Sequence, residues 1–200
     1  MAEEYTGVKY AIPEGSLVRQ TIFTVENKHL IREMKKVGRD LADRGISAGK
    51  TGNFSVRYKS GFIITATSTN LAELTDEDFV VVEGFDFKGM KLVKAYGLRE
   101  PSSETPMHNL IYSKMPDVRA IIHIHDPVLT KEKVIKKLKI KASDEGSSYG
   151  TQETAEQALG LLKENNFVVL REHGVVVVGK KFADCAAELI TYHHRGTKVK

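Results

Sequence analysis

Two short runs near the C-terminus, residues 167–170 and 175–178, are apolar at every position. A strand with one face in water alternates apolar and polar residues, so a continuous apolar run of this length predicts a strand buried on both faces. Only four residues, Arg-Glu-His-Gly, separate the two runs, and so short a polar link predicts a tight turn. We therefore expect an α/β protein whose sheet is covered by helices on both faces.

The rest of the chain alternates between strand and helix patterns. Strand patterns occur at residues 54–58, 62–66, 79–83 and 119–126, and the first two form a hairpin through Lys59-Ser60-Gly61. Helix patterns occur at residues 25–43, 104–115, 131–141, 154–165 and 182–194. The first helix carries one apolar stripe, and Gly45 is its expected C-terminal cap; the stripe is Leu30, Ile31, Met34, Val37 and Leu41. Residues 1–24 are expected to be an irregular lead-in, and residues 25–200 a single domain.

Composition excludes several classes of protein. Cys185 is the single cysteine, so no intramolecular disulfide is possible and a reducing cytoplasm is expected. No apolar run approaches the roughly 18 residues of a membrane span, and the acidic residues 1–5 do not resemble a secretory signal. The net charge of +4 is too balanced to indicate a nucleic-acid or membrane partner. Six lysines at 131–141 could bind nucleic acid, but their spacing and the lack of interleaved aromatic residues favour a solvated helix face.

Three histidines are candidate metal ligands. His123 and His125 are two residues apart in an expected strand, so their side chains share a face, with Cα atoms about 7 Å apart. Such a pair alone is more often two ordinary polar neighbours. His173 lies in the polar turn between the two apolar runs, where functional residues concentrate, and adds a third imidazole. Three neutral ligands with an open position are typical of catalytic zinc.

Three short polar turns are candidates for binding an anion. In Pro101-Ser102-Ser103-Glu104, Ser103 is the expected N-cap of a helix with Glu104 in its first turn, and the free amides and hydroxyls there would attract an anion. Gly52-Asn53 and Thr67-Ser68 are similar turns that could cradle a phosphate, with Lys50 adding positive charge. Each turn, taken singly, is also explained as a plain structural turn or helix cap.

Taken together, these segments resemble the class II aldolase/adducin-head family, and within it the L-fuculose-phosphate aldolases. The resemblance covers roughly residues 27–195, with segments in the same order and at similar spacing. The matching segments are Gly52-Asn53-Phe54-Ser55-Val56-Arg57-Tyr58, Ile64-Thr65-Ala66-Thr67-Ser68, Pro101-Ser102-Ser103-Glu104, Met115-Pro116-Asp117-Val118, His123-Ile124-His125 and His173-Gly174-Val175.

The resemblance implies a three-layer α/β/α fold with a largely antiparallel central sheet. It implies a Zn²⁺ ion on His123, His125 and His173, with Glu104 as the catalytic acid/base. It places phosphate binding on Gly52, Asn53, Thr67, Ser68, Ser102 and Ser103. The implied reaction cleaves a ketose 1-phosphate to dihydroxyacetone phosphate and an aldehyde through a metal-stabilised enediolate. The implied assembly is a cytoplasmic homotetramer with active sites between subunits.

The chain also departs from the family pattern. Ser68 replaces a glycine that is common in the phosphate pocket. The stretch after His125 is shorter than in the fuculose enzyme and has no match for the tyrosine that protonates the aldehyde oxygen. Tyr149 is the nearest substitute in the sequence, and Tyr192 is another. The sequence ends at Lys200, without the tail that covers the site in longer relatives.

Other functions on the same scaffold remain open at the level of sequence. A sugar-phosphate 4-epimerase usually carries aspartate at the position of Glu104, so Glu104 favours the aldolase. A methylthioribulose-phosphate dehydratase keeps the same metal and phosphate groups. A non-catalytic interaction module, as in adducin heads, would have no reason to retain three histidines together with Glu104.

Overall fold

The protein is described by a computed structural model that covers residues 6–47, 49–146 and 148–199. One sequence expectation falls outside this range, the absence of a secretory signal in residues 1–5.

Within the described residues, nine strands form one mixed sheet. The strands are β1 (Leu17–Val18), β2 (Asn53–Tyr58), β3 (Gly61–Thr65), β4 (Phe79–Asp86), β5 (Lys91–Tyr96), β6 (Ala120–Ile124), β7 (Lys141–Ala142), β8 (Phe167–Leu170) and β9 (Gly174–Gly179). Their order across the sheet is β1-β5-β4-β3-β2-β6-β9-β8-β7. Only the outermost pairs, β1 with β5 and β7 with β8, are parallel, so the sheet is largely antiparallel as the family resemblance implies.

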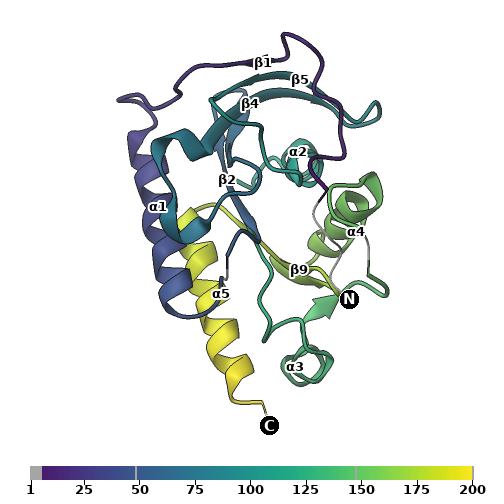
Figure 1. The fold of residues 1–200 in the computed structure, drawn as a ribbon. Helices are drawn as coiled ribbons and strands as arrows, with labels where there is room; N and C mark the ends of the chain where they lie inside the picture. The colour runs from purple at the N-terminus through teal and green to yellow at the C-terminus, as the bar shows by residue number, and fades with distance from the viewer. Residues whose placement is uncertain (1–5, 48, 147, 200) are drawn as a thin grey trace.

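Helices cover both faces of this sheet (Figure 1). One face carries α1 (Lys28–Asp43), α3 (Glu132–Leu138) and α5 (Phe182–Thr197), and the other carries α2 (Thr105–Lys114) and α4 (Gln152–Leu162). Two 3₁₀ turns, η1 (Leu71–Glu73) and η2 (Asp76–Asp78), lead into β4. The expected three-layer α/β/α architecture is confirmed.

The central strands alternate their side chains between two hydrophobic cores. Val175 and Val177 of β9 pack into the core with α1 and α5, whereas Val176 and Val178 pack into the core with α2 and α4. A strand buried on both faces has no solvent-facing position for a polar residue, which explains the continuous apolar run. The prediction from that run is therefore confirmed.

Helix α1 packs into the core along the apolar stripe that the sequence predicts. Ile31, Met34 and Leu41 are fully buried, and Leu30 and Val37 pack at the margin of the same core. The helix ends at Asp43, and Gly45 follows with φ of +70°, its N–H donating to a carbonyl of the last turn. The expected stripe and glycine cap are confirmed.

Several expected elements differ in the structure. Strand β5 was not expected, because its pattern buries only Leu92 and Ala95 among lysines and other partly exposed side chains. The lead-in includes β1, and Tyr10 in it is buried. Helix α3 ends at Leu138 because Lys139 adopts a left-handed conformation with φ of +54°, three residues before the expected end.

The start of α2 also differs. Glu104, not Ser103, is the N-cap, so the prediction for Ser103 was wrong. The Ser102 hydroxyl accepts a hydrogen bond from the Glu104 N–H at 3.2 Å, and the Glu104 side chain makes no capping bond. The Glu104 carboxylate instead accepts a hydrogen bond from outside the helix, from the backbone N–H of Gly150.

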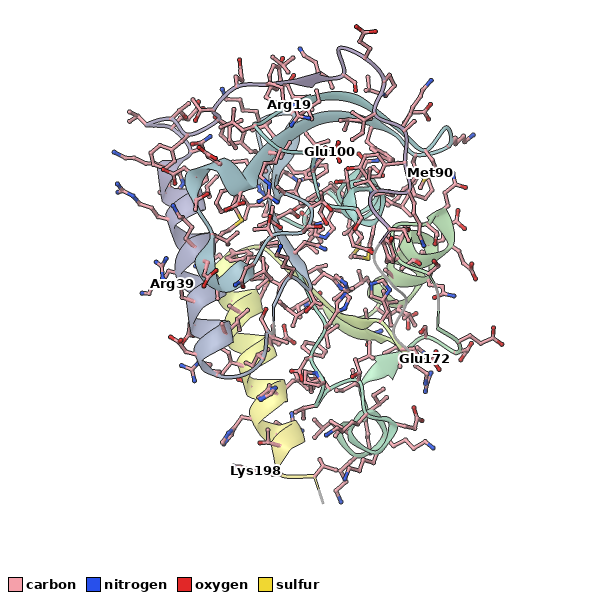
Figure 2. All side chains as sticks on the ribbon, in the orientation of Figure 1. Arg19, Arg39, Met90, Glu100, Glu172 and Lys198 are labelled. Atoms are coloured by element: carbon pink, nitrogen blue, oxygen red, sulfur yellow. The ribbon has the colours of Figure 1, made fainter. Side chains whose placement is uncertain are left out.

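Charged side chains occupy the periphery of the molecule. Arg39 and Lys198 are exposed and lie at the edge of the molecule in Figure 2, and Arg19 is exposed with its guanidinium donating to the Leu98 carbonyl oxygen. In the part of the chain that the structure describes, we find no helix that combines the length and the apolar character needed to cross a membrane.

Candidate metal centre and active site

The order of the central strands brings distant segments to one end of the sheet. Asn53 at the start of β2 pairs with His123 near the end of β6, and His123 pairs with Val176 near the start of β9. His173 directly precedes β9. Its neighbour Glu172 is exposed (Figure 2), whereas His173 is 9% exposed. The turn therefore lies at the surface, as the sequence predicts, but the imidazole of His173 is buried.

The three predicted histidines converge. The ring centroids of His123 and His125 are 4.9 Å apart, those of His123 and His173 4.9 Å, and those of His125 and His173 5.0 Å. One ring nitrogen from each lies within 4.8 Å of the other two. The Nε2 atoms of His123 and His125 are 3.0 Å apart. Three converging imidazole nitrogens form a potential coordination sphere.

The protonation of the histidines suits a cation. His123 Nδ1 lies 3.0 Å from the Val175 carbonyl oxygen, which can only accept, so Nδ1 carries the proton and Nε2 keeps its lone pair. Burial, followed by the neighbouring His173 and His125, holds the pKa of His123 well below its ordinary value. Burial and His173 lower the pKa of His125 to about 4. The rings of His123 and His125 are therefore neutral at pH 7, as metal ligands must be.

His173 supplies a further indication that the residues fit a metal ion. Its Nε2 atom is buried and has no hydrogen-bond partner among the described residues. A buried polar atom without a partner is costly, and coordination to a divalent cation would remove that cost. The three imidazole donors and this unsatisfied nitrogen atom therefore both indicate a metal site.

Glu104 lies beside the histidines. It is 3% exposed, and its Oε1 atom is 3.6 Å from His173 Nε2. The same oxygen accepts a hydrogen bond of 2.9 Å from the backbone N–H of Gly150. The N-cap residue of α2 thus holds a carboxylate in a water-poor position next to three imidazoles, where it can exchange a proton with a bound molecule.

A pocket of about 190 Å³ opens beside Glu104 and His125. All six candidate phosphate-binding residues line it, together with Lys50 and Tyr149. The full lining is Lys50, Thr51, Gly52, Asn53, Ala66, Thr67, Ser68, Ser102, Ser103, Glu104, His125 and Tyr149. Segments that lie up to about 100 residues apart in the sequence therefore build one cavity with small polar walls and one lysine.

Two backbone conformations shape this pocket. Gly52 has φ of +88°, and a Cβ atom there would lie 2.5 Å from the His123 carbonyl oxygen, so only glycine fits. Ser68 has φ of +53°, a left-handed conformation that costs a non-glycine residue roughly 1–2 kcal/mol. Glycine adopts this conformation without that cost, which explains why glycine is common at this position in the family that the sequence resembles.

Sequence reasoning missed two residues that support the site. Arg99 donates 2.9 Å to the carbonyl oxygen of Thr67 and pairs with Asp78, so it holds the Thr67-Ser68 turn. Gly150 provides the N–H that binds Glu104. No motif connects Arg99 to a turn some 30 residues earlier. Gly150 could have been singled out as a turn glycine just before Thr151, the N-cap of α4.

The two candidate tyrosines differ in position. Tyr149 lines the pocket, and its hydroxyl is hydrogen-bonded to Thr6 and Gly7. Tyr192 lies on the opposite face of the sheet and stacks on Phe167, with ring centroids 4.2 Å apart. Tyr192 therefore does not line this chain's own pocket, and a role for it across a subunit boundary stays a prediction.

Comparisons with known proteins agree with the geometry. Residues 32–195 match the family described as the Class II Aldolase and Adducin N-terminal domain. The chain is 27% identical over 165 residues to the L-fuculose phosphate aldolase of Escherichia coli (strain K12), covering 76% of this chain and 74% of that one. It is 29% identical over 171 residues to the 3-oxo-tetronate 4-phosphate decarboxylase of Haemophilus influenzae, covering 76% and 78%. A solved structure of L-fuculose 1-phosphate aldolase superposes with a TM-score of 0.69 at 26% identity, covering 88% and 86%.

The fold, the histidine cluster and these relatives define a metal-dependent lyase. More specifically, the chain belongs to the class II aldolase and adducin N-terminal domain family.

Proposed function

We propose that this protein is a zinc-dependent aldolase that cleaves a ketose 1-phosphate, similar to L-fuculose 1-phosphate, to dihydroxyacetone phosphate and an aldehyde. The observation that carries the proposal is the placement of Glu104, whose carboxylate oxygen is 3.6 Å from His173 in a cluster of three imidazoles. That cluster borders a pocket lined by small polar residues suited to a phosphate. The L-fuculose phosphate aldolase relatives support the same reaction.

We assign phosphate binding to Gly52, Asn53, Thr67, Ser68, Ser102 and Ser103. All six line the pocket. Backbone N–H groups in tight turns and at the start of a helix attract anions because their partial positive charges point outward. Lys50, at the same pocket, adds a full positive charge. This binding would orient the sugar so that its reacting carbons face Glu104.

We assign metal binding to His123, His125 and His173. A divalent cation held by three neutral imidazoles keeps its full charge, and it would act as a Lewis acid toward negative charge developing on substrate oxygens. His123 is oriented by its bond to the Val175 carbonyl, which fixes the direction of Nε2. The hydrogen bond to the backbone of β9 therefore fixes the orientation of the His123 ring before a metal ion binds.

We assign the proton transfer at carbon to Glu104. In the cleavage direction, the hydroxyl on the fourth carbon loses its proton, and the bond between the third and fourth carbons breaks. The aldehyde leaves, and the bonding electrons form an enediolate on the second and third carbons. Protonated Glu104 then delivers its proton to the third carbon, which gives dihydroxyacetone phosphate. In the synthetic direction the Glu104 carboxylate removes that proton.

Tyr149 is our candidate for the group that exchanges a proton with the aldehyde oxygen. Its side chain lines the pocket. Its hydroxyl already donates toward the Gly7 carbonyl at 3.2 Å, so a proton-transfer role requires that bond to be exchanged for one to substrate. This role stays a prediction.

Deuterium exchange tests the reaction. The zinc-loaded protein is incubated with dihydroxyacetone phosphate in deuterium oxide without any aldehyde, and the hydroxymethyl carbon is followed by nuclear magnetic resonance. We expect exchange at that carbon, and loss of exchange in Glu104→Gln. No exchange by protein that carries stoichiometric metal would contradict the proposal. A screen of aldehydes with dihydroxyacetone phosphate then identifies the second product.

A decarboxylase is the second candidate, favoured by the Haemophilus influenzae relative at 29% identity. Loss of carbon dioxide from a 3-oxo-tetronate 4-phosphate also produces an enediolate beside a phosphate-bearing carbon, so the same residues would serve. Carbon dioxide release from that substrate at a kcat/KM above that for any ketose 1-phosphate would favour this candidate.

We further propose a cytoplasmic homotetramer with active sites between subunits. The support is the family resemblance, together with exposed apolar side chains that an assembly could cover, of which Val25 is 82% and Val93 55% exposed. Light scattering coupled to size-exclusion chromatography measures the mass, and a monomer at micromolar concentration would contradict the assembly. Cell fractionation measures the location.

A further inference from the structure

A segment near the N-terminus contacts the pocket although it lies outside the stretch that matches the family. We call residues 6–10 the strap. The family match begins at residue 32, so the strap's contacts are not accounted for by that match. The strap meets two loops that both border the pocket, residues 101–104 and residues 148–150.

The first part of the strap binds the loop at residues 148–150. The N–H of Thr6 donates to the Tyr149 hydroxyl at 2.8 Å, and that hydroxyl donates to the Gly7 carbonyl at 3.2 Å. Lys9 Nζ lies 3.9 Å above the centroid of the Tyr149 ring and donates to the Ser148 hydroxyl. A hydrogen-bonded hydroxyl and a cation over the same ring restrict Tyr149 from two directions.

The last residue of the strap binds the loop at residues 101–104. The Tyr10 hydroxyl donates to the carbonyl oxygens of Pro101 and Ser102, at 2.9 Å and 3.2 Å. Tyr10 is 5% exposed, and its ring packs edge-on against Phe85 with centroids 5.2 Å apart. A buried side chain with two acceptors is held firmly, so it anchors the carbonyls that lead into Glu104.

The two loops meet at Glu104. The Gly150 N–H donates 2.9 Å to Glu104 Oε1. Gly150 has φ of +68°, and a Cβ atom there would lie 2.8 Å from the Ser103 carbonyl oxygen and 3.8 Å from the Lys9 Cβ atom. The backbones of the two loops and the Lys9 side chain therefore pack without spare room around the hydrogen bond that orients the carboxylate.

We propose that Lys9 and Tyr10 are positioning residues for Glu104. Lys9 holds the loop at 148–150, Tyr10 holds the loop at 101–104, and together they keep the Gly150 N–H on the Glu104 carboxylate. Neither residue is among those that line the pocket. The kinetic consequence rests on the proposed aldolase function, whereas the structural consequence does not. Small displacements of a catalytic group cost large factors in rate, so the contacts of the strap bear on turnover.

Hydrogen–deuterium exchange of the full-length, metal-loaded protein tests the structural part. Tyr10→Phe removes one hydroxyl and leaves the ring on Phe85, and Lys9→Met removes the charge at nearly constant length. In each variant the Gly150 amide should exchange on the order of tenfold faster than in the wild type, and faster still in the double variant. Lys9→Arg keeps a cation over Tyr149 and should restore the wild-type rate.

Two matched variants control for the chemistry of the substitutions. Tyr58→Phe removes a tyrosine hydroxyl whose hydrogen bond goes to Glu26, and Lys35→Met removes a lysine that pairs with Asp76. Both contacts lie outside the pocket lining. Exchange at Gly150 should be unchanged in these two variants. Wild-type exchange at Gly150 in a folded Lys9→Met/Tyr10→Phe double variant would overturn the proposal.

Steady-state kinetics tests the functional part. Tyr10 also binds the Ser102 carbonyl in a proposed phosphate turn, so the split between kcat and KM is measured in Lys9→Met, whose contacts described above lie on the loop at 148–150. In that variant kcat should fall on the order of tenfold while KM changes little. An equal rise in KM with unchanged kcat would overturn the assignment to Glu104. If the wild-type protein shows no aldolase activity, the proposed function fails, and the exchange measurement still decides whether the strap positions Glu104.

Discussion

Glu104 and His173 are each 4% exposed at the side chain, and their nearest polar atoms are 3.6 Å apart. Charges interact more strongly where water is excluded, so a carboxylate in this position responds to any change in its neighbours. The Glu104 carboxylate is oriented by a backbone N–H rather than by a side chain. Substitution of Glu104 itself is therefore the most direct test of the chemistry.

We predict that Glu104→Gln retains the metal but loses most turnover. Glutamine keeps the shape of the side chain and can still accept from the Gly150 N–H, but it cannot take up or deliver the proton. The expected loss in kcat is about 10²–10⁴-fold, the usual contribution of a general acid/base. Elemental analysis should find the wild-type metal content. Activity within about twofold of wild type would remove Glu104 from the mechanism.

Asp78 gives a pH-dependent prediction. Burial opposes its ionisation, but hydrogen bonds from Thr75 and the ion pair with Arg99 outweigh burial and lower its pKa below 3.8. A carboxyl whose folded pKa is depressed adds stability above its unfolded pKa of about 3.9, and that stability is lost as pH falls through the folded value. Asp78→Asn should therefore be less stable than wild type at pH 6, with the difference shrinking toward pH 3.

Chemical unfolding at several pH values measures this effect. A stability difference that stays constant between pH 6 and pH 3 would show that the Asp78 charge is not the cause. Because Arg99 also holds the Thr67 carbonyl, the same variant should loosen the Thr67-Ser68 turn and raise KM for a phosphorylated substrate.

At the scale of single residues, the sequence alone identified the three proposed metal-ligating histidines, but it did not give the distances between them. His123 and His125 follow from the period of a strand, and His173 from its polar turn. Their convergence depends on β6 pairing with β9, some 50 residues later, which no local pattern specifies. The Arg99 guanidinium binds a backbone carbonyl and Gly150 acts through its backbone amide, so no pairing of side-chain types indicates either contact.

Among the elements, those with a buried stripe or a continuous apolar run were predicted well, as in α1, β8 and β9. Strand β5 was missed because much of it is solvated and only Leu92 and Ala95 are fully buried, which weakens the period-two signal. The end of α3 was misplaced because a lysine, not a glycine, takes the left-handed position that ends it. Chain propensity is a poor guide where tertiary contacts select a strained conformation.

Two helical glycines provide a prediction about packing. A Cβ atom on Gly38 of α1 would lie 2.0 Å from the Leu71 carbonyl oxygen, whereas one on Gly160 of α4 would meet nothing within 4 Å. Gly38→Ala should therefore destabilise the protein by about 1–3 kcal/mol through overpacking. Gly160→Ala should stabilise it by about 0.5–1 kcal/mol, because alanine has the higher helix propensity.

Urea unfolding of both variants measures these changes. The two substitutions are chemically identical and differ only in the space around the helix. Equal effects of the same sign would show that the close approach of α1 to η1 is not what requires Gly38.

In the molecule as a whole, the order of the strands creates the site. Placing β2 between β3 and β6, and β6 next to β9, gathers the start of β2, the end of β6 and the turn before β9 at one end of the sheet. Helix α2 begins at the same place, with Glu104 as its N-cap. The sequence indicated the layers, but the arrangement of nine strands in space required the structure.

We predict that metal binding stabilises the entire fold. The three ligands come from β6, the residue after it and the turn before β9, so an ion held by them cross-links the centre of the sheet. Zinc at about 100 times its dissociation constant should raise Tm by roughly 5–10 °C. His173→Ala should abolish this increase. His29→Ala, at an exposed site on α1, should preserve it.

Differential scanning calorimetry with and without a chelator measures the shift. An equal increase in Tm for the wild type and for His173→Ala would mean that zinc binds elsewhere.

His123 lies on a hydrogen-bonded strand, and His125 and His173 directly adjoin strands, whereas Tyr149, Ser102 and Ser103 are carried by loops at the rim of the same pocket. Loops tolerate insertion and exchange far better than paired strands do. The proposed metal ligands and the pocket rim therefore belong to separable parts of this chain, and Glu104, next to Ser103, lies at the rim. Grafting a relative's rim onto the sheet offers a practical route to new carbon–carbon bond-forming catalysts.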